Sequence, residues 1–257
     1  MTALPNLRRM FQPDPGFTLF EADLAGADAQ VVAWEANDEK LKEAFRKKLP
    51  IHLLNAQAIF RDAELRALPL TKQGDTIAKA SPKLNAMRHK AKQGVHATNY
   101  GAQPPTVATA LQISVREAQL FQDQWFAEHP AILEWHLRTQ EQLFTSRTVI
   151  NPFGFKRFYF DRLEGLLPQA LAWVPQSTVG IAINKALVKV AQELPEVQIL
   201  LQVHDSFVGQ FPTPQHASII PKLSNLCKIT IPYPDPLTIP VSIKTSTTNW
   251  GDAKEVA

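Results

Sequence analysis

The sequence predicts an α+β fold, in which strands from both ends of the chain form one sheet and helices fill the middle. Three observations predict it: a strand-like run near the N-terminus, a long middle region with helical patterns, and two strand-like runs near the C-terminus. Grouped strands and grouped helices are typical of the α+β class. The 257 residues are enough for one large domain or two small ones.

A β-prone run over residues 17–24 is the first element, and Gly16 marks the turn before it. Alternation puts Glu21 and Asp23 on one face of this strand. Two carboxylates on a strand that otherwise suits a core are costly to bury unless they bind something. Helical patterns rich in Ala, Leu, Glu and Lys follow at 27–36, 38–47 and 51–60.

The middle region opens with a polar segment at 61–80, which leads to Ser81-Pro82, a typical helix start. The helix that follows contains Gly94, and a glycine inside a helix lowers helix stability by about 1 kcal/mol relative to alanine. We therefore expect a neighbour to approach the backbone of Gly94 closely. Pro104-Pro105 separates this helix from the next one.

Two further helices and a hairpin complete the middle region. The sequence from Ser114 to Glu117 has the pattern of a capping box and predicts a helix to about Glu128. Pro130 begins another, which ends near Ser146. The turn at 151–154 lies between two β-prone runs and predicts a hairpin.

The C-terminal region is predicted to contain a helix and three strands. The helix is expected over 176–192 and ends before Pro195. Two strands are expected within 197–211, around a tight turn at His204-Asp205. The third strand is expected over 241–245, after a Pro-rich loop.

The composition excludes several classes of protein. Apolar residues make up 45% and charged residues 20%, which is ordinary for a globular protein. The net charge of +3 is compatible with a polyanionic partner but does not demonstrate one. The single Cys227 excludes a disulfide framework and a cysteine-based zinc site. No signal-peptide pattern occurs and no apolar run approaches the ~20 residues of a membrane span, so we expect a soluble, cytoplasmic protein.

The most informative pattern is a stripe of four residues spaced four apart in the helix after Pro82: Arg88, Lys92, His96 and Tyr100. Residues at this spacing lie on one side of an α-helix. The two cations suit a triphosphate, and the two rings suit a base and a sugar. The alternative is a solvated basic face, which is less favoured because the stripe continues into rings instead of further charges.

Two aspartates suggest a second kind of chemistry. Asp23 ends the first strand and Asp205 lies in the C-terminal turn, so a sheet built from both ends of the chain could bring them together. Carboxylates held close repel each other unless cations lie between them, and two Mg²⁺ ions would suit an in-line phosphoryl displacement. The alternatives are a turn aspartate at 205 and a helix cap at 23. Neither alternative explains Arg88 and Lys92 in the same chain.

Taken in order, these motifs resemble those of the family A DNA polymerases, the group of bacterial DNA polymerase I and its phage relatives. The segment 23–28 resembles motif A, 88–101 resembles motif B and 202–205 resembles motif C. Further counterparts in the same order are Pro5-Asn6-Leu7, 37–45, Ile51-His52, 154–157, 175–178 and 249–251. Each motif is weak alone, whereas the ordered set is specific and covers nearly the whole chain.

The resemblance implies roles for the residues of the motifs. Asp23 and Asp205 would bind two Mg²⁺ ions, with the backbone carbonyl of Leu24 as a further ligand. Arg88 and Lys92 would hold the triphosphate, and Lys92 would also protonate the leaving pyrophosphate.

The remaining roles concern the sugar, the base and the DNA. His96 stands where the family has Phe or Tyr against the sugar and base, and Tyr100 would guard the templating position. Asp28 replaces a Glu that blocks the ribose 2′-OH, so a looser sugar gate is expected. The residues expected to contact primer or template are Asn6, Arg157, Gln176 and His204.

The resemblance also implies a domain arrangement. Residues 1–60 and 148–257 would form the palm, and residues 61–147 would form the helical fingers. The thumb and the 3′–5′ exonuclease domain of the family would be absent, so we expect either a separate protein chain that supplies them or a minimal form.

The expected activity is Mg²⁺-dependent, template-directed addition of dNTPs to the 3′-OH of a primer. One alternative is a polymerase that resembles the single-subunit RNA polymerases or accepts both sugars. Another is a non-catalytic DNA-binding subunit that keeps the polymerase fold. A two-metal nuclease is disfavoured because it needs no triphosphate-binding helix.

Overall fold

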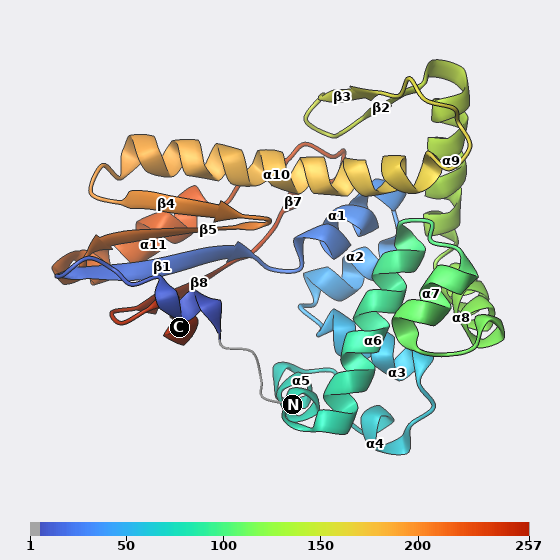
Figure 1. Cartoon of the computed structure of the whole chain (residues 1–257), viewed down its shortest axis with the longest axis horizontal. Helices are drawn as coiled ribbons and strands as arrows, with labels where there is room; N and C mark the ends of the chain where they lie inside the picture. The colour runs from blue at the N-terminus through green and yellow to red at the C-terminus, as the bar shows by residue number, and fades with distance from the viewer. Residues whose placement is uncertain (1–5, 257) are drawn as a thin grey trace. The chain divides into compact units, whose positions relative to one another are not determined.

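The strand predicted near the N-terminus is the centre of a five-stranded antiparallel sheet in the computed structural model, which describes residues 6–256 (Figure 1). The α+β class is therefore confirmed, and strands from both ends of the chain form the sheet as predicted. Pro5, the first residue of the Pro5-Asn6-Leu7 counterpart, lies outside the described residues. The strand order is β4 (Gln198–Val203), β5 (Ser206–Pro212), β1 (Phe17–Leu24), β8 (Val241–Ser246) and β9 (Lys254–Glu255).

The chain packs as two units, each described by itself. Within the described residues, the sheet unit comprises 6–28, 152–154 and 176–256, and the helical unit comprises 29–151 and 155–175. Residues 29–60, expected in the palm, thus pack with the helical unit, and the division into palm and fingers stays a prediction.

The core of the sheet unit is built from aromatic side chains on β1 and β5. The ring of Phe20 contacts the ring of Phe207 edge-on, with centroids 5.7 Å apart, and stacks on that of Phe211 at 5.9 Å. Gly209 is required beside them, because a Cβ there would lie 2.7 Å from the Phe20 ring. Helix α11 (His216–Leu226) packs against β5 and β8.

The opposite face of the sheet carries a smaller cluster of Leu19, Val208 and Trp250. Both faces of β1 are therefore largely buried, and the polar residues Thr18 and Glu21 are buried with the apolar ones. The remaining elements of this unit are η1 (Leu7–Met10), η2 (Thr213–Gln215), η3 (Trp250–Asp252), β6 (Thr230–Ile231) and β7 (Leu237–Thr238).

The helical unit contains the predicted helices together with several that the sequence does not predict. Its helices are α1 (Ala27–Ala36), which starts in the sheet unit, α2 (Glu39–Arg46), α3 (Ile51–Ile59), α4 (Ala63–Arg66), α5 (Lys72–Ala80), α6 (Pro82–Asn99), α7 (Pro104–Leu111), α8 (Val115–Glu128) and α9 (Pro130–Ser146). The predicted hairpin is β2 (Thr148–Ile150) with β3 (Lys156–Phe158).

The helix starts predicted at Ser81 and Ser114 are confirmed. The hydroxyl of Ser81 accepts a hydrogen bond from the Leu84 amide, and the capping box of Ser114 and Glu117 is complete. The polar segment 61–80 carries no clear helical pattern, yet it contains α4 and α5. Pro104-Pro105 does not only separate two helices; it begins α7, because proline suits the first helical turn.

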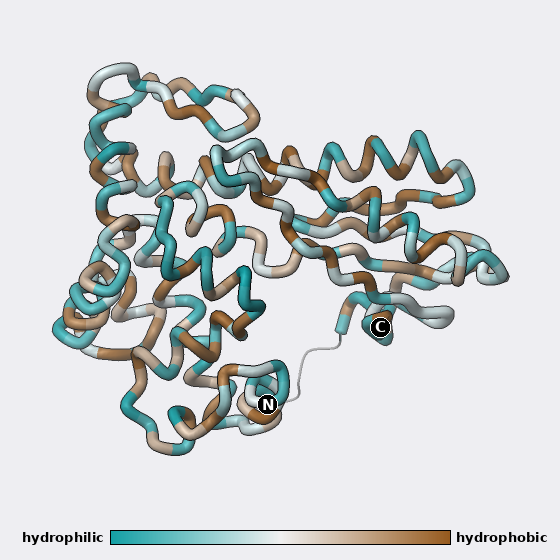
Figure 2. Tube along the Cα trace, turned by 180° about the vertical axis from the view of Figure 1, so that it is seen from behind, coloured by the Kyte–Doolittle hydropathy of each residue, from teal (hydrophilic) through white to brown (hydrophobic). Residues whose placement is uncertain are grey.

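Helix α10 (Leu167–Glu193) begins well before the predicted start at Gln176 and contains Pro175 inside it. Its residues 167–175 belong to the helical unit and residues 176–193 to the sheet unit. Residues 176–193 of α10 run alongside the sheet (Figure 1). Hydrophobic and hydrophilic residues alternate along this part of the helix (Figure 2).

The helical unit has two apolar clusters. The first joins residues of α3, α4, α5 and α6, and the second joins the end of α9, the hairpin and the start of α10. The close approach expected at Gly94 is confirmed, because a Cβ there would lie 2.9 Å from Leu111 Cδ1 and 3.1 Å from Phe121 Cε1. Within residues 6–256, no helix combines the length and apolar character needed to cross a membrane.

Candidate active site

The structure places Asp23 near the end of β1 and Asp205 in the turn between β4 and β5, beside the strand that pairs with β1. Asp23 is opposite Ser206 in the antiparallel pairing of β1 with β5. The amide of Leu24 donates a hydrogen bond to the backbone carbonyl of Asp205 at 3.0 Å. His204 has a φ of +53°, so the β4–β5 turn uses a left-handed residue immediately before Asp205. The pairing of strands from the two chain ends thus sets the two aspartates side by side.

The surroundings of Asp23 disfavour its charge. Burial and then the neighbouring Asp205 raise the pKa of Asp23 to about 6, although Lys244 acts in the opposite direction. The Asp23 carboxylate makes no hydrogen bond or ion pair with any described residue. Glu21, on the same strand, instead forms ion pairs with Arg8 and Lys244, each at 3.3 Å.

The donor set at these strands fits Mg²⁺. Among the described residues, no group of three or more His, Cys, Asp or Glu side chains could hold a metal ion. Mg²⁺, however, is commonly bound by one or two carboxylates, with water and substrate oxygens as its other ligands. The raised pKa of Asp23 marks a carboxylate whose charge a cation would stabilise. Asp23 and Asp205, with the carbonyl of Leu24, are therefore the residues that could hold it.

Helix α6 presents the predicted cationic stripe in the helical unit. Arg88 is largely buried, and its Nε donates a hydrogen bond to Asp75 Oδ1 at 2.6 Å. Lys92 is exposed and makes no hydrogen bond or ion pair with any described residue. The rings of His96 and Tyr100 are in edge-to-face contact, with centroids 4.4 Å apart. The stripe therefore combines an available ammonium group with two ordered rings.

The C-terminal end of α6 is fixed by a buried hydrogen-bond network. Trp125 Nε1 donates to Asn99 Oδ1 at 2.9 Å, and the His136 ring nitrogen Nε2 lies 2.8 Å from the Asn99 carbonyl oxygen. Gln122 donates to the Ala102 carbonyl at 2.8 Å. This network orders the end of the helix that carries His96 and Tyr100.

His52 belongs with this stripe, although sequence reasoning assigns it no role beyond a family counterpart. It lies on α3, which packs against α6. Burial, followed by the charges of Lys92 and Arg88, lowers the pKa of His52 to about 4. The imidazole is thus neutral at physiological pH and close to both cations. Only the packing of α3 on α6 reveals this, and no spacing in the sequence does.

The other predicted residues occupy varied positions. Asp28 lies half-buried in the first turn of α1. Asn6 caps η1 by accepting a hydrogen bond from the Arg8 amide at 3.1 Å. Arg157 is exposed on β3, with its guanidinium 4.9 Å from the centre of the Tyr159 ring. Gln176 and His204 are exposed.

The predicted residues divide between the two units. The sheet unit holds Asn6, Asp23, Leu24, Asp28, Gln176, His204 and Asp205, and the helical unit holds Arg88, Lys92, His96, Tyr100 and Arg157.

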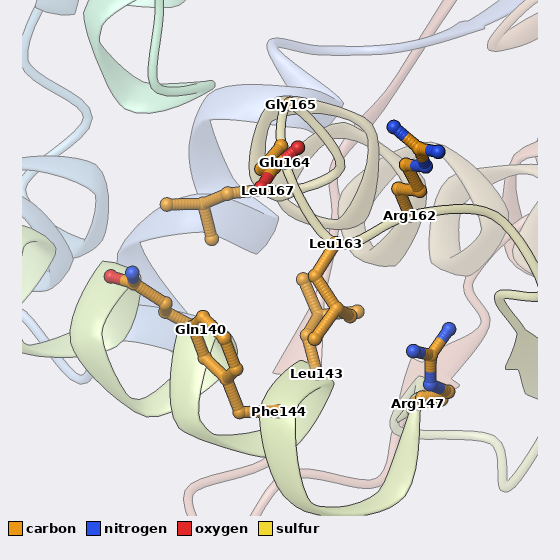
Figure 3. Close-up of a pocket in the computed structure, with 9 residues that line it drawn as sticks. All are labelled: Gln140, Leu143, Phe144, Arg147, Arg162, Leu163, Glu164, Gly165 and Leu167. Atoms are coloured by element: carbon orange, nitrogen blue, oxygen red, sulfur yellow. The ribbon is translucent and has the colours of Figure 1, made fainter.

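A surface cavity of about 640 Å³ in the helical unit contains none of the predicted residues. It lies between the end of α9 and the loop before α10, with Arg147 and Arg162 on one side and Gln140 and Phe144 on the other (Figure 3). A second cavity of about 420 Å³ near Trp125 also contains none of them. The predicted site residues therefore do not line either of these two cavities.

Comparison with known proteins identifies the family. The family model described as DNA polymerase family A matches residues 2–252. The match covers nearly the whole chain, and the chain belongs to DNA polymerase family A.

Relatives with moderate identity come from bacteria and a phage. The chain is 27% identical over 217 residues to DNA polymerase I of Caldicellulosiruptor bescii, covering 80% of this chain and 24% of that protein. It is 26% identical over 258 residues to the thermostable DNA polymerase I of Thermus aquaticus, covering 97% and 29%. It is 27% identical over 206 residues to the DNA polymerase of Mycobacterium phage D29, covering 80% and 31%. The chain thus spans 24–31% of the length of these relatives.

A solved structure shares the fold. The POL domain of Pol1 from M. smegmatis, in complex with DNA primer-template and dNTP, matches with a TM-score of 0.79 and 20% sequence identity. The match covers 96% of this chain and 42% of that chain. At this identity the likeness establishes the fold alone.

Proposed function

We propose that this chain carries out template-directed addition of dNTPs to a primer 3′-OH. The observation that carries the proposal is the pair of neighbouring carboxylates, Asp23 on β1 and Asp205 in the β4–β5 turn. Burial and the second carboxylate disfavour the charge of Asp23, and no described side chain donates a hydrogen bond to it. Membership of DNA polymerase family A supports the choice of reaction.

In the sheet unit, Asp23, Asp205 and the carbonyl of Leu24 would hold Mg²⁺. Two such ions, when bound, stabilise the charge that develops on the attacking and leaving oxygens of a phosphoryl transfer. The protein itself provides oxygen ligands at the end of β1 and in the β4–β5 turn, and the ion pairs of Glu21 keep that third carboxylate from acting as a ligand.

In the helical unit, α6 would receive the triphosphate of the nucleotide. Lys92 is exposed and has no described partner, which suits a group that binds an anion and later gives a proton to pyrophosphate. Neutral His52 would donate a hydrogen bond to the triphosphate without adding a further positive charge. The rings of His96 and Tyr100 would contact the sugar and base. Asp28, which belongs to the sheet unit, would exclude a ribose 2′-OH.

Asn6, Arg157, Gln176 and His204 would contact primer or template. Such contacts position a duplex without reading its sequence. The proposal includes a separate protein chain that grips the duplex together with this one, which is one of the two arrangements expected from the sequence. Copurification with the products of neighbouring genes tests that part.

Primer extension by the purified chain tests the main proposal. Asp23→Asn and Asp205→Asn should each reduce incorporation by about a thousandfold or more, because the loss of metal-based charge stabilisation costs several kcal/mol. Glu255→Gln, a change at an exposed carboxylate on β9 of the same sheet, is the matched control. Asp205→Asn with normal extension in Mg²⁺ would overturn the assignment.

The same assay separates the alternatives. Competition between dNTPs and rNTPs distinguishes a DNA polymerase from an enzyme that accepts both sugars, and Asp28→Ala should relax the preference further. Primer–template binding without any Mg²⁺-dependent extension would instead identify a non-catalytic DNA-binding subunit.

A further inference from the structure

The guanidinium of Arg88 is held by a carboxylate on the neighbouring helix α5. Arg88 Nε donates to Asp75 Oδ1 at 2.6 Å, and only 12% of each side chain is exposed. A short, charge-assisted hydrogen bond of this kind fixes both the position and the plane of the guanidinium. Arg88 is therefore ordered before any nucleotide arrives.

The contact leaves most of the donors of Arg88 available. A guanidinium has five N–H donors, of which Nε supplies one and the two terminal nitrogens supply four. Within the described part of the chain, the terminal nitrogens make no hydrogen bond. One helical turn further along, the Lys92 ammonium also lacks a partner among the described residues. An anion can thus bind both cations while the contact between Arg88 and Asp75 stays intact.

The charge of Asp75 is balanced from its own helix. Lys79 Nζ lies 2.7 Å from Asp75 Oδ2, so each carboxylate oxygen faces one cation. Burial opposes ionisation, but the hydrogen bonds from Lys79 and Arg88 hold the pKa of Asp75 below its ordinary value. The pair of cations therefore reduces the repulsion that Asp75 would exert on an incoming triphosphate.

The backbone before Asp75 has little freedom to move. The Gly74 amide donates to the Thr71 hydroxyl at 3.3 Å, and the Asp75 amide donates to the Thr71 carbonyl at 3.0 Å. A Cβ at Gly74 would lie 2.0 Å from the Pro69 carbonyl oxygen, so only glycine fits there. The first turn of α5 therefore sets the position of the carboxylate.

We propose that Asp75 is a positioning residue for nucleotide binding: it orders Arg88 through Nε and leaves the terminal nitrogens of the guanidinium for the triphosphate. The inference rests on the proposed function of α6 as the nucleotide-binding helix. Ordering a long side chain in advance removes that entropic cost from the binding step. The opposite role is a latch, in which Asp75 competes with the triphosphate for Arg88. In that case, removal of the Asp75 carboxylate would strengthen dNTP binding instead of weakening it.

The test measures the equilibrium affinity of the full chain for dNTP, together with KM and kcat on a primer–template. Asp75→Ala should weaken dNTP binding about 3- to 10-fold, the order expected when one long side chain must be immobilised on binding. KM should rise by the same factor, and kcat should change less. Asp75→Asn should have a smaller effect, because an amide oxygen still accepts from Nε.

A double-mutant cycle separates positioning from a structural role of α5. In the Arg88→Ala background, Asp75→Ala should have no further effect on dNTP affinity, because Asp75 acts through Arg88. Asp62→Asn is the matched control: it removes the carboxylate that pairs with Lys83 of α6 at 2.7 Å, but it does not touch Arg88. It should bind dNTP as the parent does.

Three results would overturn the inference. Unchanged or tighter dNTP binding by Asp75→Ala would exclude positioning and favour the latch. An equal loss in the parent and Arg88→Ala backgrounds would show that Asp75 supports only the fold of α5. Parent-like binding by Arg88→Ala would contradict the proposed nucleotide-binding role of α6 itself, and this inference with it.

Discussion

Two carboxylates on the same face of β1 have opposite surroundings. Glu21 is almost fully buried but forms ion pairs with Arg8 and Lys244, whereas Asp23 has no described hydrogen-bond partner and lies beside Asp205. A buried carboxylate with partners contributes to the fold, and one without partners is kept at a cost in stability. The contrast favours the proposed metal-binding role for Asp23 and a structural role for Glu21.

Asp23→Asn should therefore stabilise the metal-free chain at neutral pH. The folded-state pKa of Asp23 is raised to about 6 from 3.8, so the ionised form destabilises the fold above pH 6 and this penalty disappears below about pH 4. After allowance for the solvent exposure of Asp23, the gain in the free energy of unfolding should be about 1 kcal/mol at pH 7.5. Urea unfolding at several pH values measures it.

Glu21→Gln provides the comparison in the same strand and should lower the free energy of unfolding by about 1 kcal/mol, because Arg8 and Lys244 lose a charged partner. If Asp23→Asn were instead destabilising at pH 7.5, the Asp23 carboxylate would itself support the fold, and the contrast between the two residues would be wrong.

The sequence predicts that carboxylates on this strand are unusual but does not distinguish the structural one from the other. The distinction depends on Lys244, which is 223 positions from Glu21 in the chain. Long-range pairings of this kind follow from the strand order and not from local pattern.

The pKa of His52 should depend in part on Lys92, in addition to burial. Lys92→Ala removes one of the charges that lower the pKa of His52, so that pKa should rise from about 4 toward 6.5. NMR titration of the imidazole nitrogens measures it. The pKa of His136 is lowered by burial and not by these cations, so it should not change and serves as the control.

The folded-state pKa of His52 lies below its unfolded value, so between about pH 6.5 and 4 the unfolded chain binds a proton there that the folded chain does not. His52 should therefore lower the free energy of unfolding as pH falls through this range. His52→Gln should flatten that part of the pH profile of unfolding. An unchanged His52 pKa in Lys92→Ala would show that the two groups are not electrostatically coupled.

At the scale of elements, α6 is the helix whose packing matters most to the proposed site. It packs against α3, α5 and α7, and Gly94 permits close contact with Leu111 and Phe121. Glycine weakens a helix by about 1 kcal/mol relative to alanine, so its presence here reflects the space available and not helix propensity.

Gly94→Val should lower the free energy of unfolding by about 1–3 kcal/mol, because the added side chain overpacks against buried Leu111 and Phe121. A Cβ at Gly180, inside α10, would meet no atom within 4 Å, so Gly180→Ala should instead stabilise the chain by about 0.5–1 kcal/mol. Thermal unfolding of both variants measures the contrast. Equal effects of the two changes would mean that the space around Gly94 is not limiting.

Helices with clear caps and apolar periodicity can be predicted from the sequence, and helices held by other contacts cannot. The helix starts at Ser81 and Ser114 follow from local capping chemistry. Helix α5 escapes prediction because its only large apolar residue, Ile77, is exposed, and it is held by the small buried Ala78 and by the ion pairs of Asp75. Asp75 cannot be assigned from sequence for the same reason. The start of α10 escapes prediction because Pro175, which usually marks a helix boundary, lies inside it.

At the scale of the molecule, the proposed chemistry is divided between two units with separate apolar cores. The sheet unit holds the carboxylates and the helical unit holds the cations of α6. Both groups of residues are candidates from the sequence alone, the cations through their helical spacing and the aspartates through their places at the end of a strand and in a turn. The packing of residues 29–60 with the helical unit cannot be predicted in this way, since it depends on tertiary contacts of α1, α2 and α3.

This division predicts that different ligands protect different units from hydrogen exchange. A ligand that binds only the native state adds RT ln(1 + [L]/Kd) to local stability, which is about 1.4 kcal/mol at ten times Kd and corresponds to about tenfold slower exchange. In metal-free buffer without DNA, dNTP should slow exchange in α6 and α3 and leave β1 and β5 unchanged. Mg²⁺ alone should slow exchange at the Leu24 amide, whose acceptor is the Asp205 carbonyl.

Hydrogen exchange of the full chain, followed by peptide mass spectrometry, measures both effects. Lys92→Ala should remove the dNTP-dependent protection and leave the Mg²⁺-dependent protection intact, whereas Asp23→Asn should do the reverse, because each variant alters one unit only. Protection by dNTP that spreads equally over the strands and the helices would contradict this assignment. It would mean that the nucleotide does not depend on α6 for its binding energy, since ligand-induced protection is largest in the elements whose opening releases the ligand.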